Sequence, residues 1–171
     1  MNNFNFTESL VKGKIAETIF EQMLRNAQYK KENGEWESVF TVLHFGYEHV
    51  LPELAKNKEI KKGKNVTLDA IRTAPDFAVV NNKTKKVNLI EVKYRTHRSK
   101  KDTLKVAKKM EESWITAKLF LATPEGFYFD NIKNIIKNNG EIKKLVHPNI
   151  TENTQKIYLD LLIKYEINPE K

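Results

Sequence analysis

The sequence contains no cysteine, which excludes disulfide bonds and thiolate-bound metal sites such as structural zinc centres. This absence agrees with a reducing compartment. The first residues lack the basic start and apolar run of a signal peptide, and no stretch reaches the roughly 18 consecutive apolar residues of a membrane span. We therefore expect a soluble, cytoplasmic protein without a membrane partner.

Several motifs of catalysis and binding are also missing. The sequence has no Gly-x-x-x-x-Gly-Lys-Ser/Thr phosphate loop and no Gly-x-Ser-x-Gly nucleophile motif, so nucleotide-driven motors and serine hydrolases lack support. No internal repeat or low-complexity linker occurs, and 171 residues suit a single domain spanning residues 1–171. The histidines lack the spacing of a helical zinc site, and we assign structural or surface roles to His44, His49 and His147. His97, in the basic loop after Lys93, either contacts phosphate or is merely exposed.

Arginine is scarce, whereas lysine is abundant. Thirty basic residues, of which only four are arginine, outweigh 22 acidic ones and give a formal charge of +8. Residues 93–109 hold eight basic residues and one acidic residue, a net charge of +7, which suits a phosphate backbone and predicts salt-dependent binding of DNA. A solvated helix face is the alternative explanation for any single lysine. The candidate nucleic-acid contacts are Arg95, His97, Arg98, Lys100, Lys101 and Lys105.

Residues 75–94 have the pattern of a β-hairpin, because two apolar, β-branched runs flank a short turn rich in Asn and Lys. Side chains alternate between the faces of a strand, so Glu91 and Lys93 point to one face and their apolar neighbours to the other. Asp76 opens the first strand of this hairpin. Folding of the hairpin is expected to bring Asp76 close to Glu91 and Lys93.

Asp76 and Glu91 together suit a divalent cation, since two adjacent carboxylates repel each other unless a cation lies between them. Mg²⁺ is usually held by one or two carboxylates, with water and substrate phosphate as further ligands, and Mn²⁺ is a reasonable substitute. Lys93 would orient or deprotonate the attacking water, or neutralise charge on phosphate. Ordinary turn chemistry at Asp76 and a chance Glu-x-Lys triplet are the alternative. The order, spacing and strand context favour the catalytic interpretation.

Pro75-Asp76, fourteen intervening residues and then Glu91-Val92-Lys93 resemble the active-site hairpin of the PD-(D/E)xK nuclease superfamily. The resemblance is sharpest over about twenty residues. It implies a restriction-endonuclease-like fold, catalytic roles for Asp76, Glu91 and Lys93, and Mg²⁺ held by Asp76, Glu91 and the backbone carbonyl of Val92. It also implies a homodimer, because many relatives pair two sites to cut two strands.

The expected first helix carries a second resemblance. Its segment Gly13-Lys14-Ile15-Ala16-Glu17 is similar to a Gly-x-x-x-Glu pattern in many members of the superfamily, including the Holliday-junction resolvase branch. In those proteins the glutamate reaches the metal site, so the resemblance implies that Glu17 supports catalysis and metal binding. A boundary salt bridge with Lys14, or a contact with Gln22, is the alternative for Glu17.

The remaining patterns predict an α/β fold with a mixed sheet flanked by helices. The expected core has the order αβββαβ over residues 8–122, with a parallel crossover, an insertion over 46–72 and a C-terminal extension over 123–171. Asp102 is the expected cap of the helix after the hairpin. The predicted helices span residues 8–28, 51–58, 102–112, 131–138 and 153–166, and the further strands span 36–45, 114–122 and 127–129.

These observations lead to the hypothesis of a Mg²⁺-dependent nuclease that hydrolyses DNA phosphodiester bonds, an endonuclease of resolvase-like or restriction-like type. The alternative from another class is a non-catalytic, basic nucleic-acid-binding protein in which the carboxylates only pair with lysines. A third possibility is a relative with the same fold that cuts RNA. These hypotheses differ in whether strand breakage occurs, whether it requires Mg²⁺, and which nucleic acid is cut.

Overall fold

The structure is a computed structural model that describes residues 3–45, 70 and 73–167. The helix expected over 51–58 and most of the expected insertion over 46–72 lie outside the described residues. Among the described helices, none is both long enough and apolar enough to cross a membrane.

The centre of the protein is a five-stranded mixed sheet in the order β3-β4-β5-β6-β7. β5 and β6 are parallel, and every other neighbouring pair is antiparallel. β4 and β5 form the expected hairpin, in which Phe77 pairs with Ile90 and Val80 with Val87. The strands are β3 (Phe40–His44), β4 (Phe77–Asn81), β5 (Val87–Tyr94), β6 (Lys118–Thr123) and β7 (Gly126–Asn131).

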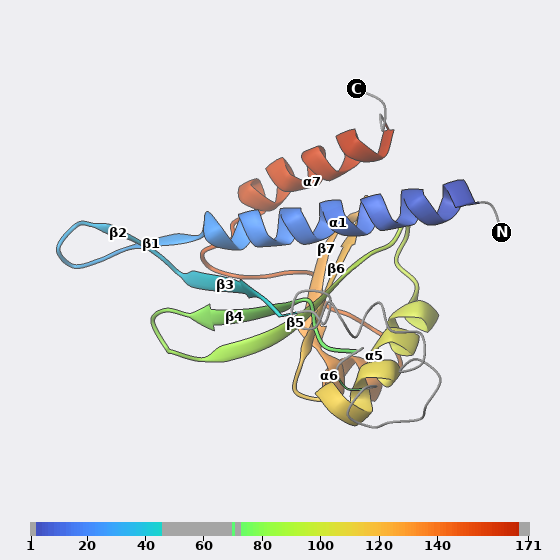
Figure 1. Cartoon of the computed structure of the whole chain (residues 1–171). Coiled ribbons are helices and arrows are strands. Elements are labelled where there is room, and N and C mark those ends of the chain that lie inside the picture. Colours follow the sequence, from blue (N-terminus) through green and yellow to red (C-terminus); the bar gives the residue numbers. More distant parts are fainter. Residues whose placement is uncertain (1–2, 46–69, 71–72, 168–171) are drawn as a thin grey trace, which may run out of the picture.

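Helices cover both faces of this sheet (Figure 1). On one face, α1 (Asn3–Arg25) packs on the sheet with α7 (Glu152–Ile167) beside it, and their core includes Phe20, Phe77 and Phe120. On the other face, α5 (Lys100–Trp114) and α6 (Ile132–Lys137) enclose a second core that includes Met110 and Leu121. The prediction of an α/β fold with a mixed sheet is therefore confirmed, and the order α1, β3, β4, β5, α5, β6 is the predicted one.

The boundaries differ from the prediction in several places, of which the first is a strand. The strand expected over 36–45 is divided, because β2 (Trp36–Ser38) pairs with β1 (Gln28–Lys30) in a separate two-stranded ribbon and only Phe40–His44 joins the main sheet. The division falls at Val39, which bonds through its backbone N–H to the Ala27 carbonyl and through its carbonyl to the Asn82 N–H. The chain thus turns at Val39 from the ribbon into the sheet.

The start and end of α5 also correct the prediction. Ser99, and not Asp102, caps this helix, since the Ser99 hydroxyl accepts a hydrogen bond from the Asp102 N–H at 3.2 Å. The helix continues to Trp114, so the strand expected from residue 114 begins only at Lys118. The strand expected over 127–129 is the edge strand β7, so part of the presumed C-terminal extension belongs to the sheet.

Candidate active site

β5 presents different chemistry on its two faces, as the alternation of its sequence predicts. Ile90, Val92 and Tyr94 are buried in the core beneath α1. Glu91 and Lys93 lie between them in the chain and point to the opposite face, where their side chains are 13% and 33% exposed. Their position is therefore partly enclosed while it still admits solvent.

Asp76 lies immediately before β4, next to this part of β5. Its backbone carbonyl accepts a hydrogen bond from the Phe45 N–H at 2.9 Å, which holds the end of β3 against it. Its side-chain Oδ2 accepts a hydrogen bond from the Val92 N–H at 2.7 Å. β4 begins at Phe77, whose partner is Ile90, so the Asp76 carboxylate takes the place of the backbone acceptor that a longer β4 would offer to the Val92 N–H. This bond fixes the carboxylate beside Glu91 and Lys93.

Burial and neighbouring charge both disfavour ionisation of Asp76. Burial is the larger cause and the Glu91 carboxylate the next, and together they raise the pKa of Asp76 from 3.8 to about 7. The Lys93 ammonium and the Val92 N–H act in the opposite direction without compensating. Two neighbouring carboxylates that are largely buried repel each other, so the site favours a positive charge between them.

Lys93 supplies part of that positive charge, because its ammonium forms an ion pair with Glu91. Burial lowers the pKa of Lys93, but attraction by Glu91 and then by Asp76 outweighs burial, so the pKa lies above its ordinary value. Lys93 is therefore protonated at neutral pH in this arrangement. Its position suits neutralisation of charge or orientation of a bound group better than removal of a proton.

The available oxygen atoms fit a hard cation with few protein ligands. Among the described residues, only the Val92 N–H donates a hydrogen bond to the Asp76 carboxylate, which leaves Oδ1 for a ligand. A residue in an extended strand directs its N–H and its carbonyl to the same side, so the Val92 carbonyl points to the side on which Asp76 lies. No cluster of three or more His, Asp or Glu side chains suited to a metal occurs in the described part of the chain. A site of two carboxylates and one carbonyl would fit Mg²⁺, which retains several waters, better than a metal that needs an all-protein cage.

Glu17 does not join Asp76 and Glu91 in such a cluster. It forms the alternative contact, an ion pair with Lys14 at 2.7 Å, and its side chain is 24% exposed. Its charge nevertheless contributes to the raised pKa of Asp76, so Glu17 lies within electrostatic range of the carboxylate site. Its role as a supporting residue remains a prediction.

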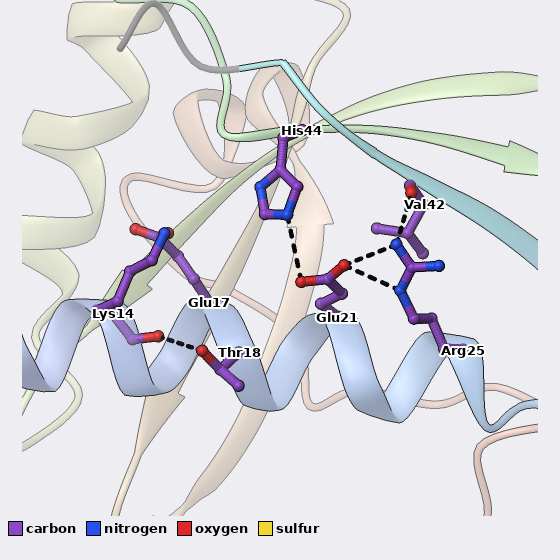
Figure 2. Close-up of polar contacts among 7 residues, drawn as sticks. All are labelled: Lys14, Glu17, Thr18, Glu21, Arg25, Val42 and His44. Atoms are coloured by element: carbon purple, nitrogen blue, oxygen red, sulfur yellow. Dashed lines mark hydrogen bonds and ion pairs between the residues drawn. The ribbon is translucent and has the colours of Figure 1, made fainter. Parts of the chain in front are cut away.

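A polar network that the sequence did not reveal connects α1 to β3 beside the site (Figure 2). Glu21 forms an ion pair with Arg25 at 2.7 Å and contacts His44 Nε2 at 3.3 Å. Arg25 also donates a hydrogen bond to the Val42 carbonyl at 3.1 Å. The His44 ring packs against the Phe77 ring, with 4.9 Å between the ring centroids. The spacing of Glu21 and Arg25 on one helix was a detectable signal for the first contact. The network holds the end of β3 next to Asp76, in agreement with a structural role for His44.

The predicted nucleic-acid contacts divide into three groups. Arg98 and Lys100 form ion pairs with Glu141, and Arg98 also lies over the Tyr128 ring at 5.1 Å. Arg95 is half-buried, bonds to the Tyr94 carbonyl at 2.7 Å, and its charge acts on Lys93, so it lies at the edge of the site. The remaining three are exposed, with His97 in the loop before α5 and two on the helix itself, namely Lys101 and Lys105.

The site thus consists of Asp76, Glu91 and Lys93 at the end of the β4–β5 hairpin, with Glu17 and Arg95 at its electrostatic edge. No protein-family model matches the chain, and no curated protein matches it.

Proposed function

We propose that the protein is a Mg²⁺-dependent nuclease of the PD-(D/E)xK type that hydrolyses phosphodiester bonds in DNA. The observation that carries this proposal is the arrangement of Asp76, Glu91 and Lys93. Asp76 is fixed by the Val92 N–H, burial and then Glu91 raise its pKa, and Lys93 pairs with Glu91. The order of elements around the site is also the order that the resemblance implies for a restriction-endonuclease-like core.

In this proposal Asp76, Glu91 and the Val92 carbonyl hold Mg²⁺. When bound, the cation supplies Lewis-acid activation of water and of the phosphate. Lys93 remains protonated and neutralises negative charge that develops on the phosphate oxygens. Arg95 and the exposed lysines of α5 orient the phosphate backbone along the edge of the site. Glu17 acts through its charge on the carboxylates.

The decisive experiment is a cleavage panel with linear duplex, single strand, flap and four-way junction DNA, each in Mg²⁺ and in EDTA. We expect Mg²⁺-dependent cutting that falls by about two orders of magnitude or more in Asp76→Ala and in Lys93→Ala. The matched controls are Asp160→Ala and Lys156→Ala, which remove the same charges from exposed positions on α7. If Asp76→Ala cuts as fast as Asp160→Ala, the assignment is wrong.

The competing function is that of a nucleic-acid-binding protein without catalysis. The ion pair between Glu91 and Lys93 favours it, because these two side chains satisfy each other without a metal. This alternative predicts salt-sensitive DNA binding that Mg²⁺ and EDTA leave unchanged, and no strand breakage.

Matched RNA and DNA strands in the same panel distinguish an RNA-cutting relative. Sedimentation of the protein with and without duplex tests the proposed homodimer.

A further inference from the structure

A cavity of about 210 Å³ lies on the face of the sheet opposite the carboxylates. β5 separates the two sites, because Ile90 lines the cavity while its neighbour Glu91 points to the other face. The cavity is bounded by α1, by strands β3 to β7 and by the segment that connects α6 to α7. Its walls are mainly apolar and include the rings of Phe20, Phe120 and Phe129. The Phe20 and Phe120 rings are tilted relative to each other, and their centroids lie 4.8 Å apart.

Two of the polar residues that line this cavity have only a hydrogen-bond donor left to offer. Asn81 uses its side-chain oxygen to accept hydrogen bonds from the Lys83 and Thr84 N–H groups at 3.0 and 2.8 Å, which leaves its amide nitrogen. His147 accepts a hydrogen bond from the Asn149 N–H at its Nδ1, at 3.2 Å. Burial lowers the pKa of His147, so the ring is neutral and carries its proton on Nε2. Both residues therefore favour a ligand that accepts hydrogen bonds.

The third polar contribution is a cation. Lys118, at the start of β6, is half-buried, lines the cavity and lies over the Phe129 ring at 5.5 Å. Burial lowers the pKa of Lys118, the positive charge of Lys86 lowers it further, and Asp130 opposes the shift only through a longer-range attraction. Lys118 forms no ion pair with any described residue. The cavity thus has a partly desolvated ammonium that no acidic side chain in the described part of the chain pairs with.

We propose that this cavity binds a small organic monoanion with an apolar body, such as an aromatic carboxylate, whose charged group lies at Lys118. The apolar walls accept the body of the ligand, and Asn81 and His147 donate hydrogen bonds to its oxygens. A cavity of about 150 Å³ is sufficient for benzene, so this volume accommodates one ring with a carboxylate. It is too small for a nucleotide, since sites for larger ligands span about 300–1,000 Å³.

The test is an NMR titration of the full chain with benzoate and, in parallel, with benzyl alcohol, which has a similar ring but no charge. We expect benzoate to shift the side-chain amide of Asn88, which lines the cavity, and the ring signals of His147. Lys118→Met is expected to weaken benzoate binding by about tenfold or more, because a hydrogen bond to a charged group is lost. Lys118→Arg keeps the charge and is expected to retain binding. Lys137→Met, at the end of α6, is the matched control and should not change it.

Three results would overturn the proposal. The first is the absence of benzoate binding at millimolar concentrations in the parent protein. The second is equal binding of benzyl alcohol, which would mean that the charge is not recognised. The third is a loss of benzoate binding in Lys118→Arg, or in the Lys137→Met control, that equals the loss in Lys118→Met. None of these results depends on DNA cleavage, so this inference and the proposed nuclease activity fail or succeed separately.

Discussion

Replacement of Asp76 by asparagine is expected to stabilise the metal-free protein at alkaline pH. The pKa of Asp76 rises from 3.8 in its ordinary state to about 7 in the fold. Below the lower value both the folded and the unfolded protein hold the proton, and the group has no effect. Between the two values only the unfolded chain is ionised, so the free energy of unfolding falls as the pH rises, and above pH 7 the loss is complete.

The size of this effect follows from the shift. About three pH units at about 1.4 kcal/mol each correspond to a loss of about 4 kcal/mol between about pH 4 and pH 8. Asparagine does not ionise, and its side-chain oxygen still accepts the hydrogen bond from the Val92 N–H. The attraction between the carboxylate and Lys93 is already contained in the pKa of about 7, so it does not reduce the difference further. We therefore expect Asp76→Asn to be more stable than the parent by about 4 kcal/mol at about pH 8.

Urea unfolding followed by circular dichroism, in EDTA at about pH 4 and about pH 8, measures this difference. The parent and Asp76→Asn should be nearly equal at the lower pH and should diverge at the higher one. Asp160→Asn, an exposed carboxamide substitution on α7, is the matched control and should follow the parent at both. If Asp76→Asn is not more stable than the parent at alkaline pH, Asp76 is not the buried carboxylate with a raised pKa described above.

Mg²⁺ should narrow the difference in stability between the parent and Asp76→Asn at alkaline pH. A ligand that binds only the folded state at a hundred times its Kd stabilises it by about 2.7 kcal/mol. The parent should gain this stability, because the cation offsets the repulsion between Asp76 and Glu91, whereas Asp76→Asn should gain little. Equal stabilisation of the parent and the variant by Mg²⁺ would contradict the assignment of Asp76 as a metal ligand.

Other positions give predictions of similar sharpness. Gly140→Ala should lower the free energy of unfolding by more than about 2 kcal/mol in urea, because its φ is +86° and a Cβ would collide with the Lys100 carbonyl. Gly13→Ala, within α1 where a Cβ meets nothing, should instead raise it by about 0.5–1 kcal/mol. Ser99→Ala should cost about 1 kcal/mol through loss of the α5 cap, and Ser99→Asp should restore it. Glu141→Gln removes the partner of two basic side chains, so filter-binding assays should show tighter DNA binding with a steeper salt dependence.

The face that each hairpin residue occupies was predictable from the sequence, and the reason is local. Alternation along a strand has a period of two, so once the strand is recognised the faces of Glu91, Val92 and Lys93 follow without any knowledge of the rest of the fold. The approach of Asp76 also depends only on the short turn of the hairpin. The part of the candidate site that lies within one hairpin could therefore be inferred from about twenty residues.

Features that depend on distant segments could not be inferred in this way. Ser99 and Asp102 are both good capping residues, and the choice between them is made by where α5 packs on the sheet. Glu21 was recognisable as a partner of Arg25, but its contact with His44 requires α1 to lie against β3. Likewise, the cavity joins residues as far apart as Phe20 and Ile150, which no sequence pattern connects.

The alternation of β5 has a practical consequence for testing both proposals. Lys118 on β6 pairs in register with Ile90 on β5, so the Lys118 cation lies beside the residue that immediately precedes Glu91 in the chain. Substitutions at Lys118 therefore alter one face of the sheet, and substitutions at Asp76 or Lys93 alter the other. Because the sheet backbone is shared, a change that weakens both DNA cleavage and benzoate binding would indicate a disturbed strand and not two lost contacts. Only variants that affect one function and retain the other can assign a residue to its site.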